Sequence, residues 1–203
     1  MTKRGTDAAG ALWQADDCGA WLAARAAYDG ALLATGGERL EQLDRWYHGA
    51  LALASRRPLA VTLDELVEVV QWKMHRGVFR ARNLMLVRQN SAEEVGEASR
   101  AAFDAVPDPS LPIARLSALK GIGPATASAV LAAARPDVYP FFDDVAAAAI
   151  PDFGAIKYTA KGYATFSERL RERAALLATG CPNDDWTPHA VECALWAAAG
   201  GKG

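Results

Sequence analysis

The sequence contains few cysteines, no long apolar run and no strong net charge, which are the features that most directly indicate a class of protein. Among its 203 residues are three cysteines, Cys18, Cys181 and Cys193, with no paired short spacing that would put two thiolates on one metal ion. No apolar run approaches the ~18 residues of a membrane-spanning helix, and the N-terminal MTKRGTDAAG lacks the apolar core of a signal peptide. We therefore expect a cytoplasmic, reduced protein that has neither a disulfide framework nor a zinc site and does not contact a membrane.

A strong net charge is also missing. The chain carries 22 basic and 24 acidic side chains, which gives a formal net charge of −2. Proteins that coat nucleic acid by bulk charge have strongly basic compositions, so this balance excludes that class. Any contact with nucleic acid must come from a local patch.

What the sequence does contain is alanine and apolar residues that recur every three or four positions, a pattern that predicts an all-α fold of about nine or ten helices. Capping boxes mark two helix starts, because Thr62 precedes Glu65 and Ser91 precedes Glu94 by three positions. The proline-rich segment 107–112 is the best candidate for a hinge between two lobes. The predicted helices cover about 8–28, 38–54, 63–76, 80–87, 91–106, 113–119, 125–134, 145–150, 160–178 and 188–199.

The most specific segment is 116–127, LSALKGIGPATA, which predicts a tight hairpin between two helices. Gly121 and Gly123 can both adopt positive φ and leave backbone amides uncovered, while Ile122 anchors the turn in the core. The amides lie next to the start of the helix near Pro124, a position that suits a phosphate oxygen. Lys120 within the hairpin is placed for a backbone phosphate.

This segment resembles the helix-hairpin-helix motif of DNA-binding proteins, and residues 111–150 resemble the helix-hairpin-helix (HhH-GPD) DNA glycosylase superfamily. In that superfamily a loop and then an aspartate follow the hairpin, where this chain has Asp143 and Asp144. The chain also looks like a little-characterised group with a Trp-Lys-x-x-Arg-Gly-x-Phe-Arg segment, here at 72–80. The resemblance implies a single two-lobed helical domain over 1–203, with a hairpin lobe at about 111–150 and residues 1–106 and 151–203 packed around it.

The resemblance implies a monofunctional DNA glycosylase that flips a damaged base out of double-stranded DNA and hydrolyses its N-glycosidic bond. The aspartate would stabilise the oxocarbenium-like sugar and orient or deprotonate the attacking water. Endonuclease III-like spacing selects Asp143, and the Pro-Asp-Asp arrangement of alkyladenine-type members selects Asp144. We favour Asp144, since it directly precedes the helical run 145–149 and as its N-cap would project its carboxylate from the helix start. The alternative function is a DNA-binding or scaffold protein that has lost catalysis.

Other features of the superfamily are missing here. Bifunctional members carry a nucleophilic lysine at the position of Ala125, so no Schiff-base lyase activity is expected. Their iron-sulfur loop needs four closely spaced cysteines, and only Cys181 and Cys193 lie near the C-terminus. We expect a monomer without a cofactor, except for a structural monovalent cation at the hairpin carbonyls, and a nucleoid association if the protein is bacterial.

A basic stretch precedes the hairpin, since residues 71–91 contain five basic residues and no acidic one. We expect Gly77 to turn the chain so that Arg76 and Arg80 face one side, and we expect Trp72 and Phe79 in the core. His48 and His189 lack metal-ligand spacing and are predicted to be surface or half-buried residues. The predicted DNA-binding residues are Lys73, Arg76, Arg80, Arg82, Lys120, Gly121, Ile122, Gly123, Ala125 and Thr126.

Overall fold

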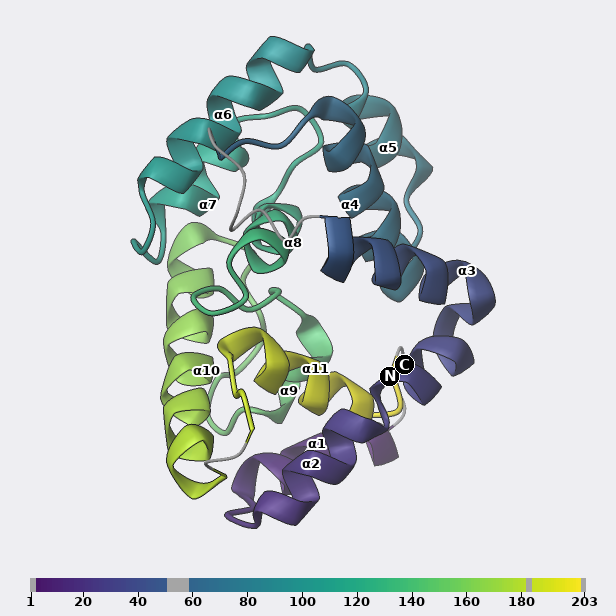
Figure 1. Cartoon of the computed structure of the whole chain (residues 1–203), viewed down its shortest axis with the longest axis vertical. Coiled ribbons are helices and arrows are strands. Elements are labelled where there is room, and N and C mark those ends of the chain that lie inside the picture. The colour runs from purple at the N-terminus through teal and green to yellow at the C-terminus, as the bar shows by residue number, and fades with distance from the viewer. Residues whose placement is uncertain (1–2, 51–58, 182–183, 202–203) are drawn as a thin grey trace.

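The computed structural model describes residues 3–50, 59–181 and 184–201, which form helices and, within these ranges, no strand (Figure 1). The all-α prediction is therefore confirmed for this part of the chain. The helices are α1 (Lys3–Gln14), α2 (Cys18–Ala26), α3 (Tyr28–Ala50), α4 (Leu63–Arg76), α5 (Ala81–Val87), α6 (Ala92–Asp104), α7 (Leu111–Leu116), α8 (Pro124–Ala134), α9 (Asp144–Ala149), α10 (Ala160–Gly180) and α11 (Pro188–Ala198).

Both predicted capping boxes are present. At the start of α4 the Glu65 amide donates to Thr62 Oγ1 at 3.2 Å, and the Thr62 amide donates to Glu65 Oε2 at 2.8 Å. Ser91 and Glu94 repeat this exchange at the start of α6, with distances of 3.1 and 2.6 Å. These local signals set where the two helices begin, because each satisfies amides that the helix leaves without partners.

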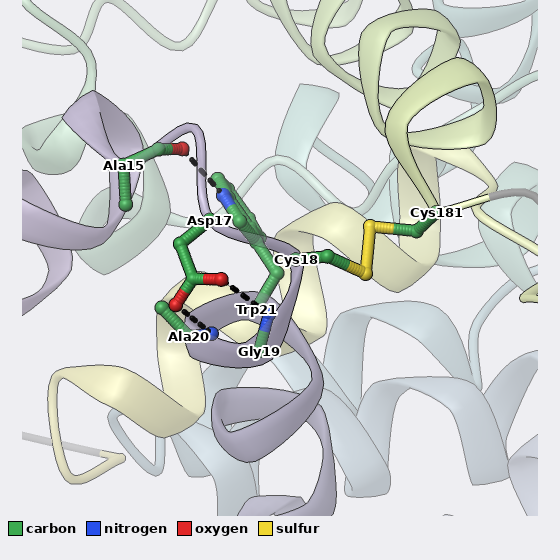
Figure 2. The surroundings of a disulfide bond; sticks show 7 residues. All are labelled: Ala15, Asp17, Cys18, Gly19, Ala20, Trp21 and Cys181. Atoms are coloured by element: carbon green, nitrogen blue, oxygen red, sulfur yellow. Dashed lines mark hydrogen bonds between the residues drawn. A yellow bond between two sulfur atoms is a disulfide. The ribbon is translucent and has the colours of Figure 1, made fainter.

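The first half of the chain differs from the prediction in two places. The predicted helix 8–28 is divided into α1 and α2, because the Asp17 carboxylate caps α2 by accepting from the amides of Gly19 and Ala20 (Figure 2). The second difference is a helical segment 28–36 that the sequence did not predict; the predicted helix 38–54 starts after it as expected, directly after the break at Gly37, where φ is 60° and ψ is −158°. Residues 51–54 of that prediction lie outside the described residues.

A disulfide joins Cys18, at the start of α2, to Cys181, directly after α10 (Figure 2). The expectation that the chain has no disulfide was wrong. The two cysteines are separated by 163 positions, and spacing along the chain gives no sign that they meet. Trp21 and Trp186 pack edge to face near the bridge, with ring centroids 5.9 Å apart. Cys193 is free and buried.

The helices pack in two groups (Figure 1). In the hairpin group, α4 contacts α5, α6 and α8, and α7 contacts α6 and α8. In the terminal group, α11 contacts α1, α2, α9 and α10. Helix α3 contacts both α4 and α11, and α7 also contacts α10. Each group therefore buries its own apolar faces, and both meet around α3, α4 and α11.

The proline-rich segment 107–112 is not the hinge that the sequence suggested. It joins α6 to α7, which pack against each other within the hairpin group. The Asp108 carboxylate fixes the segment by accepting from the amides of Ser110 at 2.8 Å and Leu111 at 2.6 Å. The chain instead leaves the hairpin group after α8, along residues 135–143, which lead into the candidate site.

Candidate functional site

The predicted hairpin is the turn between α7 and α8. Gly121 has φ +77°, and a Cβ at this position would lie 2.9 Å from both the Asn83 carbonyl oxygen and Leu86 Cβ. Glycine is therefore required here by conformation and by space. Ile122 is buried and anchors the turn, as predicted. Gly123 has an extended backbone with φ −100° and ψ 177°, so the expectation of positive φ was wrong at this position.

The hairpin is held by the basic stretch before it. Asn90 donates from Nδ2 to the Lys120 carbonyl at 3.0 Å and accepts at Oδ1 from the Lys120 amide at 2.9 Å. The Lys120 side chain is exposed, with Nζ 3.3 Å from the carbonyl oxygen of Gln89. The exposed Gly123 is the N-cap of α8, and it provides no side-chain cap. Pro124 carries no N–H, and the amides of Thr126 and Ala127 donate to the Gly123 carbonyl at 2.9 Å, so the start of α8 presents the Ala125 amide and a positive dipole end to an incoming anion.

A pocket of about 620 Å³ opens where the start of α8 meets the α4–α5 turn and the start of α9. This volume lies within the range of sites that enclose small molecules or cofactors, about 300–1,000 Å³. The predicted site residues on its wall are Lys73, Arg76, Arg80, Gly123, Ala125, Thr126, Asp143 and Asp144. Three segments that lie apart in the sequence therefore converge on one cavity.

The two aspartates stand in different environments. Asp143 is buried and is the N-cap of α9, with Oδ1 accepting from the Ala146 amide at 2.9 Å. Its burial raises the pKa of its carboxyl group to about 7, with Glu192 adding to the rise while Arg76 and the Ala146 hydrogen bond oppose it. Asp144 is exposed in the first turn of α9. The cap that the sequence analysis placed at Asp144 is therefore formed by Asp143.

Basic and phenolic groups face the two carboxylates. Lys73 is half-buried, and this burial, together with Arg80, lowers the pKa of its ammonium group, while Asp143 and Asp144 act against the change. Burial and the two carboxylates raise the pKa of Tyr158 to about 12, so its phenol stays protonated at neutral pH. Arg80 is exposed at the wall of the pocket, and Arg82 is also exposed.

Arg76 does not lie where the sequence analysis put it. Its side chain is buried and donates to Glu192 from Nη1 to Oε2 at 3.3 Å and from Nη2 to Oε1 at 2.5 Å. It forms part of the inner wall of the pocket, so the prediction that Gly77 turns it to the surface beside Arg80 was wrong. Trp72 is buried as predicted, stacked on Tyr47 at 3.8 Å between ring centroids. Phe79, predicted in the core, is 55% exposed.

Several wall residues escaped the sequence analysis. Asn83, Phe142, Tyr158 and Trp196 line the pocket but carry no motif. Tyr158 lies beyond the end of α9, so helical periodicity does not connect it to the aspartates, and its ring packs on Phe142 with 5.3 Å between ring centroids. Only the fold brings these side chains together.

No protein-family model, curated protein or solved structure matches the chain. Within the described ranges, none of the helices is long and apolar enough to cross a membrane. The function must therefore be argued from the pocket and the hairpin themselves.

Proposed function

We propose that the chain is a monofunctional DNA glycosylase that hydrolyses the N-glycosidic bond of a damaged base. The observation that carries the proposal is the single pocket shared by the start of α8, which suits a phosphate, and the carboxylates of Asp143 and Asp144. A glycosylase needs both features, because it must hold the DNA backbone while it acts on a nucleotide outside the base stack. The hydrolysis requires no redox cofactor.

The hairpin would hold the DNA. The Ala125 amide at the positive end of α8 and the exposed ammonium group of Lys120 would contact phosphate oxygens on either side of the flipped nucleotide. Arg80 and Arg82 extend this positive edge across the α4–α5 turn. Such a local patch can bind a duplex despite the net charge of −2, since exposed charges more than about 10 Å apart are screened at moderate salt.

The pocket would take the flipped nucleotide, at a cost of a few kcal/mol for unstacking. Tyr158 is 46% exposed and its ring packs on Phe142, so it offers a fixed aromatic face at the pocket wall for a base to stack on. Asp144, exposed in the first turn of α9, would stabilise the positive charge that develops on the sugar as the bond to the base breaks.

Asp143 would act on the proton of the attacking water. A carboxyl group with a pKa of about 7 can gain or lose a proton near neutral pH, which is the property that a general base needs. Ala125 offers no amine at the position of the family's nucleophilic lysine, so the reaction would stop at the abasic site.

The second candidate function is a DNA-binding or scaffold protein without catalysis. One observation favours it, because the carboxylate of Asp143 already serves as the cap of α9 and thus has a structural use. The glycosylase remains the stronger proposal, since a binder has no need for a pocket of about 620 Å³ behind the hairpin.

Duplexes that each carry an alkylated, deaminated or oxidised base test the proposal. The protein should produce abasic sites that alkali cleaves, and Asp144→Asn should remove the product while keeping duplex binding. Asp64→Asn is the matched control, because Asp64 is also exposed in the first turn of its helix but lies outside the pocket wall. Duplex binding with no product on any lesion would instead establish the second candidate.

A further inference from the structure

A separate cluster of ligand-type side chains lies between α3 and α11. His48 on α3 and the buried pair His189 and Cys193 on α11 offer ligand atoms that all lie within 4.8 Å of one another. His189 and Cys193 are four positions apart, which places them on one face of α11. We propose that these three side chains bind a divalent transition metal ion of the zinc type.

The distances suit such an ion. Cys193 Sγ lies 3.8 Å from His189 Nε2. Zinc binds sulfur at about 2.3 Å and imidazole nitrogen at about 2.0–2.1 Å, so tetrahedral ligand atoms stand about 3.3–3.6 Å apart. The binding of an ion would draw the three ligand atoms, which now lie within 4.8 Å of one another, to this separation. Three protein ligands leave the fourth position for a water molecule.

A metal ion takes imidazole rings in their neutral form and cysteine as the thiolate. When the metal binds, the S–H bond breaks, the sulfur electron pair forms the bond to the metal, and the proton passes to solvent.

Acidic groups lie beside the two rings. His189 Nδ1 lies 3.4 Å from Glu192 Oε2 and makes no hydrogen bond within the described part of the chain, while its Nε2 lies 3.8 Å from Cys193 Sγ. His48 Nε2 lies 3.5 Å from Asp44 Oδ2. Ligating histidines commonly donate from their second nitrogen to a carboxylate, and these two acidic groups are close enough to take that role when a metal binds.

The acidic groups are themselves held in place. Asp44 Oδ1 accepts from Tyr28 Oη at 2.9 Å and from Trp72 Nε1 at 2.7 Å. Glu192 is bound by Arg76, so the cluster contains two buried carboxyl groups and one guanidinium group. A bound cation would balance this excess of acidic groups. The site would brace α3 against α11, and this role is independent of the proposed DNA chemistry.

Cobalt(II) is the probe, added to the full chain after treatment with a chelator and with the Cys18–Cys181 disulfide intact. The expected result is one cobalt per chain, with a thiolate-to-metal charge-transfer band and the visible absorption of a tetrahedral ion. Zinc should displace the cobalt and abolish both features. The thermal midpoint should rise with the zinc concentration, because the ion binds the folded state.

Variants test the ligand set. His48→Ala should weaken cobalt binding at least tenfold, and the side chain of His48 is 41% exposed, so this change leaves the core packing intact. Cys193→Ser should abolish the charge-transfer band, with circular dichroism to confirm that the variant folds. His75→Gln is the matched control, because His75 is the remaining histidine and its Nδ1 lies 2.8 Å from the Gln71 carbonyl oxygen on α4. The absence of a charge-transfer band in the unaltered protein, or an equal loss of affinity in His75→Gln, would overturn the proposal.

Discussion

The guanidinium group of Arg76 and the carboxylate of Glu192 form a buried pair of two hydrogen bonds that ties α4 to α11. The guanidinium carbon lies 4.4 Å from the centre of the Trp196 ring and 5.2 Å from that of Trp72. Burial alone would lower the pKa of Arg76, but Glu192 holds it well above its usual value, so the group stays charged. The pair links the hairpin group to the terminal group beside the pocket.

Glu192→Ala should destabilise the protein by about 3–5 kcal/mol, because it leaves the Arg76 charge buried without its partner. Urea denaturation measures this loss. Arg45→Ala is the control, since Arg45 and Glu41 form an exposed pair at 2.9 Å whose removal should cost less than about 1 kcal/mol. Equal losses in the two variants would contradict the role given to the buried pair.

Titration of the Asp143 carboxyl group should lower the free energy of unfolding as the pH rises from about 4 to about 7. Its carboxyl group loses its proton near 3.8 in the unfolded chain and near 7 in the folded protein, so the folded state binds more protons in this window. Asp143→Asn keeps a side chain that can cap α9 but does not titrate. The variant should match the unaltered protein near pH 4 and gain on it by about 1.4 kcal/mol for each pH unit up to about 7.

Urea titrations at several pH values between 4 and 8 measure this difference. Asp144→Asn serves as the control, because an exposed carboxylate in a first helical turn contributes about 0.3–1 kcal/mol and has no burial cost to remove. A difference between Asp143→Asn and the unaltered protein that stays constant with pH would show that Asp143 is ionised throughout.

The two hairpin glycines should respond differently to substitution. Gly121→Ala should lower the stability by at least about 1–3 kcal/mol, from backbone strain at φ +77° and the close approach to Asn83. Gly123→Ala should cost less than about 1 kcal/mol, since a Cβ there meets nothing within 4 Å. If the hairpin binds phosphate, Gly123→Val should keep the fold and weaken duplex binding about tenfold or more. Unchanged affinity would make the hairpin a structural turn.

Reduction of the disulfide should cost about 2–5 kcal/mol, because the bond closes a long loop in the unfolded chain. The Cys18–Cys181 separation of 163 positions puts the effect toward the upper part of that range in the chain-entropy account. Denaturation with and without reductant measures it, and Cys18→Ser should show no further response to reductant. Peptide mapping without reduction should recover the two cysteines in one linked fragment.

Salt dependence should locate the surface that contacts DNA. Arg80→Ala should lower the slope of log affinity against log salt concentration by about 0.9, the value for one phosphate contact with a duplex. Arg45→Ala is an exposed control on α3, away from the pocket wall, and should leave the slope unchanged. Equal slopes in Arg80→Ala and the unaltered protein would show that the α4–α5 turn does not contact DNA.

The features that the sequence predicted correctly depend on close neighbours. The capping boxes at Thr62 and Ser91 and the positive φ of Gly121 depend on residues only a few positions away, so the sequence pattern alone predicts them. The aspartates and the hairpin were connected by a family resemblance, and the structure places both on one pocket wall.

The features that the sequence missed depend on distant partners. Arg76 was predicted to face the same side as Arg80 because Gly77 was expected to turn the chain, and its buried position follows from Glu192, 116 positions away. The Cys18–Cys181 bond and the meeting of His48 with α11 have the same origin. Phe79 shows the opposite failure, since its aromatic side chain was expected in the core and is 55% exposed.

The arrangement of the helices also orders their assembly. The hairpin group occupies the continuous stretch 63–134, so its contacts can form as soon as that stretch has left the ribosome. The terminal group combines α1 and α2 with α9–α11, and Gly5 in α1 approaches the carbonyl oxygen of Ala199 so closely that a side chain would not fit. The contacts of α1 and α2 with α11 therefore form only after α11 has been synthesised, and until then the apolar faces of α1 and α2 stay exposed to solvent. Helices α1 and α2 thus precede α11 in the sequence but can pack only after it has been made.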